Sequence, residues 1–287
     1  MSPVSVISDT THSMPPEIVA ASGATQISLY VKDASGERRE SEITDLDDFY
    51  GRMREGGSLP TTSQPSVGDF LAVYEPLVAA GNDVVSVHIS SELYGTVSTA
   101  QQAAQEIAAR GSGPRVEVID SGAACAQLGF VVLAAAAAAR SGDDIDAVAQ
   151  RAREARKHSK MFWALDSLEH LRRGGRIGPA QAWLGGALKI KPILSVDGSI
   201  IPVERVRTWS RALDRLTHYM QANKDNGATT WIVQHIQGPD QAAALVEIGR
   251  EIYGTEPLFV SEVGPVVGVH LGPGMLGTCG VPPALLV

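Results

Sequence analysis

One short stretch of the chain strongly constrains the fold. The β-branched run Val84–Ile89 passes through hydroxyl residues and Gly95 into a long helical pattern, Val97–Arg110. This is the pattern of a strand that leads through a polar turn into a helix. Free backbone N–H groups, the positive end of the helix dipole and side-chain hydroxyls meet at such a turn. The turn therefore has the chemistry to hold a carboxylate or a phosphate.

The hydroxyl residues of this turn have a second interpretation. Ser and Thr are preferred at helix N-termini for structural reasons alone, so they could simply cap the helix. The residues concerned are Ser90, Ser91 and Thr96. A second hydroxyl-rich segment, Thr61–Ser66, precedes another helix and favours anion binding. There Ser66 and Asp69 form a variant of the capping box, which predicts a helix that extends to Ala80.

Strands and helices alternate over the first half of the chain. Strands are predicted at Val4–Ile7, Gln26–Val31, Val84–Ile89 and Val116–Ile119, and further helices at Pro16–Ala21, Leu46–Arg54, Cys125–Arg140 and Ile145–His158. Asp33–Glu42 reads as a charged turn. The alternation predicts a doubly wound, mainly parallel sheet. Asp9 and Asp120 end two of the strands, where open α/β sheets place ligands, although Asp9 could equally be a turn and cap residue.

The second half has a different pattern. Lys189–Val196 and Ser199–Val206 flank Asp197-Gly198, which is a strong hairpin signal and predicts a mixed sheet. Other strands are predicted at Phe162–Ala164, Thr230–Gln234, Leu258–Val260 and Val266–Val269, and helices at Ser210–Asn223 and Asp240–Tyr253. A chain of 287 residues exceeds the usual size of one core. We therefore predict an α/β protein of two domains, residues 1–160 and 161–287.

Composition and spacing exclude several classes of function. The net charge of −8 disfavours nucleic-acid binding, which needs a basic surface. Cys125 and Cys279 are too few for a disulfide framework and are expected to be buried. The histidines lack metal-ligand spacing, and the longest apolar run, Leu128–Ala139, is too short to span a membrane. We expect a cytoplasmic monomer without a metal or a cofactor.

His270 follows the apolar run Val266–Val269 and precedes a loop rich in glycine and proline. It could donate a hydrogen bond to an anion, or it could be a satisfied loop residue. The loop Gly272–Gly277 matches G-x-G-x-x-G, but that dinucleotide fingerprint requires a following helix, a second strand and an acidic residue, and few residues follow here.

Six segments in order resemble the DegV family over nearly the whole chain. They are Thr62-Ser63-Gln64-Pro65-Ser66, Ile89-Ser90-Ser91-x-Leu93-x-Gly95-Thr96, Asp120-Ser121, Leu171-Arg172-Arg173-Gly174-Gly175-Arg176-Ile177, Lys191-Pro192-Ile193-Leu194 and Gly264-Pro265-Val266-Val267-Gly268-x-His270-x-Gly272-Pro273-Gly274. No single segment is decisive, but six in the family's order are highly specific.

The resemblance implies a two-domain protein that buries a long-chain fatty acid, such as palmitate or oleate, between its domains. It also implies a non-catalytic role as the acyl-carrying subunit of a bacterial fatty acid kinase, whose separate ATP-using subunit phosphorylates the bound carboxylate. By position, the fatty-acid-binding residues would be Thr62, Ser63, Ser91, Tyr94, Gly95, Thr96 and His270. The residues that face the kinase subunit would be Arg172, Arg173 and Arg176.

One departure from the family falls in the expected site. The family usually reads Leu-Ser-Gly-Thr where this chain has Leu93-Tyr94-Gly95-Thr96. A phenol on a longer arm therefore replaces a hydroxyl that would touch the carboxylate. Tyr94 could donate from further out, or it could point away from the head group.

A serine-dependent esterase or acyltransferase is the alternative function. Its nucleophile would be Ser63, Ser90 or Ser91, and it would need a histidine base oriented by a third group. His270 is the only candidate base that the sequence suggests. No G-x-S-x-G motif is present, which disfavours this alternative.

Overall fold

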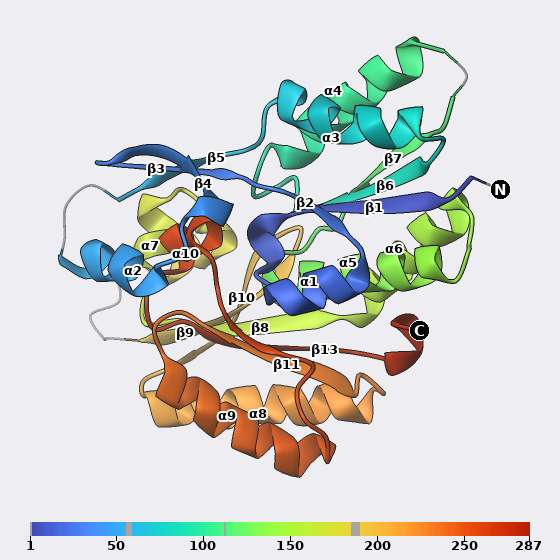
Figure 1. Cartoon of the computed structure of the whole chain (residues 1–287). Helices are drawn as coiled ribbons and strands as arrows, with labels where there is room; N and C mark the ends of the chain where they lie inside the picture. Colours follow the sequence, from blue (N-terminus) through green and yellow to red (C-terminus); the bar gives the residue numbers. More distant parts are fainter. Residues whose placement is uncertain (1, 56–58, 112, 185–189) are drawn as a thin grey trace.

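The computed structural model describes residues 2–55, 59–111, 113–184 and 190–287. Two large sheets lie roughly one above the other with helices between them and on both outer sides (Figure 1). A small third sheet lies to one side of them, and the two termini lie at the opposite side (Figure 1). No helix in these ranges is long and apolar enough to cross a membrane.

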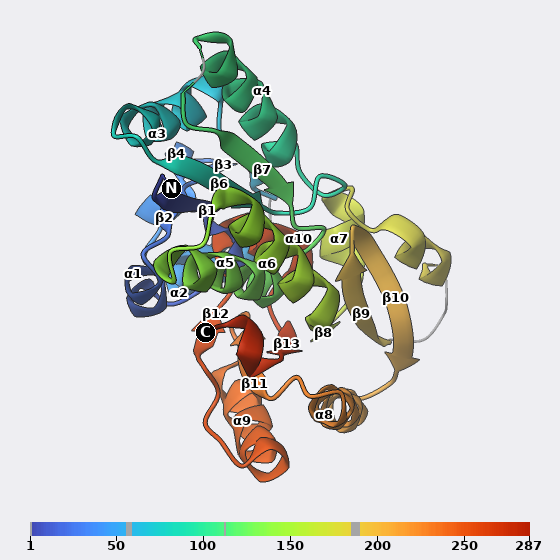
Figure 2. The same cartoon turned by 90° about the vertical axis from the view of Figure 1, so that its right-hand side faces the viewer.

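The first large sheet is entirely parallel. Its strands, in spatial order, are β2 (Thr25–Ile27), β1 (Val4–Asp9), β6 (Asp83–His88) and β7 (Val116–Asp120). Helices α3 (Val67–Ala79) and α4 (Thr96–Ala109) cover one face, and α5 (Cys125–Arg140) and α6 (Ile145–His158) cover the other (Figure 2). The predicted doubly wound sheet is therefore confirmed.

The second large sheet is mixed, as predicted. Its order is β10 (Ser199–Val206), β9 (Lys191–Asp197), β8 (Lys160–Ala164), β13 (Leu276–Val281), β11 (Thr230–His235) and β12 (Val260–Glu262), and only the β11–β12 pair is parallel. Helices α8 (Trp209–Asp225) and α9 (Pro239–Tyr253) cover its outer face (Figure 1). The predicted start of the hairpin at Lys189 lies outside the described residues.

Strand β13 is central to this sheet but was not expected from its sequence. Two of its six residues are glycines, which weaken the local strand pattern. Both glycines are required by packing. A Cβ on Gly277 would lie 2.7 Å from Trp163 Cδ1, and one on Gly280 would lie 3.0 Å from the Ala228 carbonyl oxygen. Because the neighbouring elements approach so closely, glycines stand where β-branched residues would otherwise have indicated a strand.

The small third sheet corrects three expectations. The predicted strand Gln26–Val31 is divided between β2 and a separate strand, β3 (Tyr30–Asp33). The segment expected as a charged turn contains β4 (Gly36–Arg39), and the hydroxyl-rich segment Thr61–Ser66, where no strand was expected, begins with β5 (Thr61–Ser63). These strands form an antiparallel sheet in the order β4-β3-β5. The division occurs at Ser28 and Leu29, whose oxygens accept hydrogen bonds from the backbone of Ser41 and Glu40.

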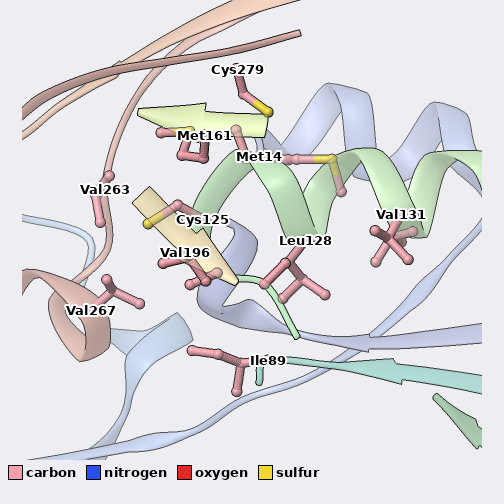
Figure 3. Packing of buried hydrophobic residues seen from close by; sticks show 14 of the residues in the cluster. Met14, Ile89, Cys125, Leu128, Val131, Met161, Val196, Val263, Val267 and Cys279 are labelled. Atoms are coloured by element: carbon pink, nitrogen blue, oxygen red, sulfur yellow. The ribbon is translucent and has the colours of Figure 1, made fainter. Parts of the chain in front are cut away.

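Helix α5 lies between the two large sheets, which explains its alanine-rich sequence. Thirteen of its sixteen residues are buried, and such all-round burial is expected of a helix with no polar face. Leu128 and Val131 lie on this helix, with Ile89 on the side of the parallel sheet and Met161 and Cys279 on the side of the mixed sheet (Figure 3). Small side chains let both sheets approach the helix, so one core crosses the predicted domain boundary.

The apolar run before His270 is a helix, α10 (Pro265–Leu271), and the predicted strand is wrong. Pro265 occupies the first helical position, where its fixed φ and missing N–H are tolerated. Gly268 lets the helix pack against Tyr50, because a Cβ there would lie 1.8 Å from Tyr50 Oη. Three further α-helices in the described ranges are α1 (Pro16–Ser22), α2 (Leu46–Glu55) and α7 (Glu169–Arg173).

Candidate functional site

An apolar cavity of about 20 Å³ lies where the two halves of the chain meet. Ile89, Leu93 and Ala124 line it from the first half, and residues of β8, α7, β10 and α10 line it from the second. Ile89 directly follows β6, so the cavity lies at the carboxyl edge of the parallel sheet, where such folds bind ligands. Tyr94, Arg176 and His270, three residues that carry polar groups, also line it.

Four side chains form a polar cluster at this cavity: Thr62, Tyr94, Arg176 and His270. Thr62 Oγ1 donates to Tyr94 Oη over 3.4 Å and lies 3.3 Å from His270 Nε2. Tyr94 Oη donates to the Val266 carbonyl oxygen over 2.9 Å, and the Tyr94 ring meets the His270 ring edge-on. The Tyr94 phenol therefore points toward Thr62 and His270 and not away from them. Burial raises its pKa, so it is a neutral donor.

The strand alternation of β5 decides which hydroxyl joins the polar cluster. Thr62 pairs with Val31 of β3 and presents its hydroxyl to Tyr94. Ser63 points to the opposite face, as successive residues of a strand do, and lines a surface groove with Tyr30 and Asp69. Of these two adjacent residues, the structure places only Thr62 in the polar cluster.

His270 is held as a neutral imidazole. It is 6% exposed, and burial followed by the positive charges of Arg176 and His170 lowers its pKa to about 4. A Cβ on Gly174 would lie 2.1 Å from His270 Nδ1, so the loop after α7 can pass here only with a glycine. If Thr62 donates to Tyr94, the proton of the imidazole lies on Nε2. Among the described residues, Nδ1 has no hydrogen-bond partner.

The three arginines at the end of α7 and in the loop after it differ in their surroundings. Arg172 is exposed and paired with Glu169, and Arg173 is exposed. Arg176 is half-buried, with its guanidinium 5.2 Å above the Tyr94 ring centre. It donates to the carbonyl oxygens of Leu93 and Gly174 and forms no ion pair within the described ranges. A cation that lacks a counter-ion beside a cavity favours an anionic ligand.

The hydroxyls of the turn before α4 do not cap that helix, which corrects the capping interpretation. Gly95 is the N-cap and gives no side-chain hydrogen bond. Ser90 Oγ donates to the Gly198 carbonyl oxygen over 2.6 Å, and Ser91 Oγ donates to Asp120. Thr96 is fully buried, and its hydroxyl has no partner among the described residues.

Gly95 has a packing role that joins the two hydroxyl-rich segments. A Cβ at this position would lie 2.9 Å from Gln64 Nε2. The missing side chain at Gly95 leaves room for the Gln64 amide, so the segment after β5 lies against the turn before α4. This contact brings Thr62 to Tyr94.

A buried relay inside the parallel sheet was not found by sequence reasoning. Ser86 Oγ lies 2.7 Å from His88 Nε2, and His88 Nδ1 lies 3.1 Å from Asp9 Oδ2. Tyr74 donates to Ser86 over 2.8 Å. Burial raises the pKa of Asp9, but hydrogen bonds from His88, Thr11 and the Ile89 N–H together hold it below its usual value.

The buried relay links a serine, a histidine and an aspartate in the order of a catalytic triad, but a substrate cannot reach it. Ser86, His88 and Asp9 are each 0% exposed. A nucleophile must reach its substrate, and these groups are enclosed by the sheet and its helices. Asp9 instead caps the short helix η1 (Thr10–His12) through the Thr11 N–H. The relay therefore offers no active site for the esterase alternative. The candidate nucleophiles Ser63, Ser90 and Ser91 form no hydrogen bond to a histidine in the described part of the chain.

Comparison with known proteins extends the resemblance. The family model described as "Uncharacterised protein, DegV family" matches residues 3–282. A DegV domain-containing protein of Streptomyces coelicolor is 37% identical over 96% of each chain. Protein DegV of Bacillus subtilis is 33% identical over 96% of this chain and 98% of its own.

Solved structures agree with the sequence relatives. A fatty-acid-binding DegV family protein of Thermus thermophilus has a TM-score of 0.88 at 31% identity, over 98% of this chain and 99% of its own. The structure of DegV from Bacillus subtilis, described as a fatty acid binding protein, has a TM-score of 0.87 at 32% identity with the same coverage. With the match to the family model, these likenesses show that the chain belongs to the DegV family.

Proposed function

We propose that this protein binds a long-chain fatty acid, with the carboxylate at the polar cluster and the hydrocarbon chain in the cavity between the two halves. The observation that carries the proposal is the junction of an apolar cavity with a group of hydrogen-bond donors and one arginine that lacks a counter-ion among the described residues. Relatives with the same fold are described as fatty-acid-binding proteins, which supports it.

The donors of the polar cluster suit a carboxylate. Thr62 and Tyr94 bring hydroxyls, neutral His270 brings one N–H, and their mutual distances of 3.3–3.4 Å are long enough to be replaced by shorter bonds to an anion. Arg176 adds a positive charge over the Tyr94 ring. The N-terminus of α4 has no side-chain cap, and the adjacent Thr96 hydroxyl has no partner among the described residues, so further donors lie near.

The hydrocarbon chain supplies most of the affinity. Burying about fourteen methylenes contributes roughly 11 kcal/mol, against costs of association and ordering of ~4–15 kcal/mol. A cavity of about 20 Å³ has room for a single water molecule. Binding therefore requires the lining side chains to separate, and these come from several elements of both halves. The head-group hydrogen bonds then decide between weak and tight binding.

We further propose that the protein is non-catalytic and presents the carboxylate to a separate kinase subunit that forms an acyl phosphate. The basis is the segment formed by the end of α7 and the loop after it, with Arg172, Arg173 and Arg176, which provides positive charge beside the head group on an acidic protein. Arginine binds phosphate oxygens in pairs and stays charged. Arg176→Ala removes one positive charge from the head-group site and should weaken oleate binding by about tenfold or less, because the other donors remain. At saturating oleate it should nevertheless abolish radiolabel transfer in a reconstituted kinase pair. Equal transfer by variant and wild type would contradict this role.

Denaturing extraction of freshly purified protein, followed by mass spectrometry, tests the ligand. We expect a saturated or monounsaturated fatty acid of about sixteen to eighteen carbons, the lengths that the family resemblance implies. A ligand that binds only the folded state also raises the melting temperature, by an amount that grows as RT ln(1 + [L]/Kd). Protein that extracts without lipid and shows no thermal shift with palmitate or oleate would contradict the proposal. Turnover of a chromogenic ester that is lost in Ser90→Ala would favour the esterase.

A further inference from the structure

Glu40 is a buried acid that packs against the N-terminus of α10. It lies in the short helix η2 (Glu40–Glu42) and is 6% exposed. A Cβ on Gly264, just before α10, would lie 2.5 Å from Glu40 Oε1. The absence of a side chain at Gly264 therefore makes room for this carboxyl group. Glu40 is more than two hundred residues away from α10 in sequence, so the contact is purely tertiary.

The Glu40 carboxyl group is bonded to the residue that holds Tyr94. Oε1 accepts the Val266 N–H over 2.8 Å, and Oε2 accepts from the Thr10 hydroxyl. The carbonyl oxygen of the same Val266 accepts the Tyr94 phenol over 2.9 Å. Glu40 and Tyr94 thus bind the two polar groups of one residue. Through Val266, Glu40 fixes the start of α10, the helix that accepts the Tyr94 phenol and carries His270.

No cation in the described part of the chain compensates this carboxyl group. Glu40 forms no ion pair within the residues that the structure describes. Its titratable neighbours are all acids, namely Asp9 of β1, Tyr50 of α2, Cys125 of α5 and Tyr94. Burial raises the pKa of Glu40 to about 7, and the negative charge of Asp9 acts in the same direction. The group therefore exchanges its proton near neutral pH.

Both protonation states of Glu40 satisfy the same two partners. As a carboxylate it accepts from Val266 and from Thr10. As an acid it still accepts the Val266 N–H at Oε1, while its O–H donates to the Thr10 hydroxyl oxygen, since a hydroxyl can also accept. A proton can therefore enter or leave without the loss of a hydrogen bond. A ligand carboxylate at the polar cluster, separated from Glu40 by Val266 and Tyr94, would favour the protonated state of Glu40.

We propose that Glu40 is the positioning residue of the head-group site and that it takes up one proton when an anionic ligand binds at the polar cluster. The inference rests on the proposed function, because the anion is the fatty-acid carboxylate. The proton passes from solvent to Glu40 Oε2, and no other bond is made or broken. The fatty acid and the proton then bind together, so the Glu40 carboxylate and the ligand carboxylate are not both charged and buried side by side.

Calorimetric titration of oleate at pH 7, in two buffers with different ionisation enthalpies, measures the protons bound. If the ligand raises the pKa of Glu40 by about one unit, wild type takes up about 0.4 proton, and its affinity falls about 5-fold from pH 6 to pH 8. Glu40→Gln reproduces the neutral acid, since its amide accepts from Val266 and donates to Thr10. It should bind as wild type does at pH 6, with a flat pH profile and no proton uptake.

Two variants separate positioning from bulk structure. Glu40→Ala removes both hydrogen bonds, including the one that holds the start of α10, the helix that carries His270, and should weaken oleate binding at every pH. Glu40→Gln should restore it. Glu42→Gln is the matched control, because Glu42 lies in the same short helix but is exposed, and it should keep the wild-type proton uptake. If the Glu40 variants fail to fold, infrared difference spectra of wild type with and without oleate at pH 7 replace them. A gain of protonated carboxyl is expected there.

The possible failures are distinguishable. Wild type that does not bind oleate would refute the fatty-acid proposal and the Glu40 proposal with it. Wild type that binds oleate with the same proton uptake as Glu40→Gln, or without any gain of protonated carboxyl, would refute the role of Glu40 alone.

Discussion

The buried relay in the parallel sheet and the polar cluster at the cavity use the same kinds of side chain. Each has a histidine, an aliphatic hydroxyl and a tyrosine. The relay of Asp9, Tyr74, Ser86 and His88 is linked by bonds of 2.7–3.1 Å, and all its polar side-chain atoms are partnered. In the polar cluster Thr62 makes bonds of 3.3–3.4 Å, and His270 Nδ1 has no partner among the described residues.

This difference separates a structural network from a binding site. Buried polar groups are normally saturated with hydrogen bonds, and a saturated network stabilises one conformation. The relay meets that condition and is fully enclosed. The polar cluster does not meet it and borders an apolar cavity. Residue type alone would have ranked the relay, with its Ser, His and Asp, as the better functional candidate.

Removing the acid of the relay should have the largest effect on stability. Asp9→Ala leaves His88 and the N–H groups of Thr11 and Ile89 without their acceptor in a fully buried place. We expect a loss of ~3–5 kcal/mol in the free energy of unfolding, measured by urea denaturation. Asp214→Ala, on the exposed side of α8, is the control and should change it by about 0.5 kcal/mol or less. If Asp9→Ala lowered the free energy of unfolding by as little as the control does, the relay would not be needed for stability.

Acid should destabilise the protein through the neutral His270. The folded pKa of about 4 lies below the ordinary value of 6.5, so between these pH values the unfolded chain binds a proton that the folded chain does not. His270 therefore contributes stability that is present above pH 6.5 and is lost as pH falls toward 4, by up to ~3 kcal/mol in total.

Comparison of His270→Gln with wild type isolates this contribution. Glu40 acts with the opposite sign at pH 4.5–7, because its folded pKa is raised, so the wild-type curve alone does not separate the two groups. Over the same interval the stability of His270→Gln should fall less than that of wild type. Parallel curves of stability against pH for the two proteins would show that His270 titrates normally when folded.

Truncating Thr62 should weaken oleate binding with the fold intact. Thr62→Ala removes a hydrogen bond to a charged acceptor, which costs ~1.5–3 kcal/mol of affinity. Ser63→Ala is the matched control, because Ser63 is the next residue of β5 and faces away from the polar cluster. Isothermal titration of both variants measures the difference. Equal losses would show that the head group does not lie at Thr62.

Restoring the family residue should have the smallest effect. Tyr94→Ser removes a ring that lines the cavity and the bond to the Val266 carbonyl oxygen, and returns a hydroxyl on a short arm. Oleate affinity should be preserved or rise by up to about tenfold in the same titration, because the head group gains space. Strong weakening in Tyr94→Ser, with no effect in Thr62→Ala, would mean that the head group lies elsewhere.

Local sequence determined most of the regular elements. Helices α5 and α6 have the predicted bounds, Ser66 and Asp69 form the predicted capping box, and the turn at Asp197-Gly198 joins β9 to β10. These patterns depend on residues a few positions apart, so the sequence contains the whole signal. The two cysteines are buried and free, as expected. The family motifs also identified Thr62, Tyr94 and His270, which the structure brings together.

Tertiary structure decided what depends on residues far apart in sequence. Trp163 and Ala228 lie so close to β13 that only glycine fits at the two contact positions, and Tyr50 has the same effect at Gly268. At these positions the sequence therefore lacks the side chains that indicate a strand or a helix. The partners of Ser91, Asp9 and Glu40 are likewise distant in the chain, and no spacing rule connects them. A single sequence specifies which side chains are present. Whether a hydroxyl or an acid faces a cavity, a helix end or another side chain is set by the packing of whole elements, because that packing fixes which groups meet and how far each is removed from water.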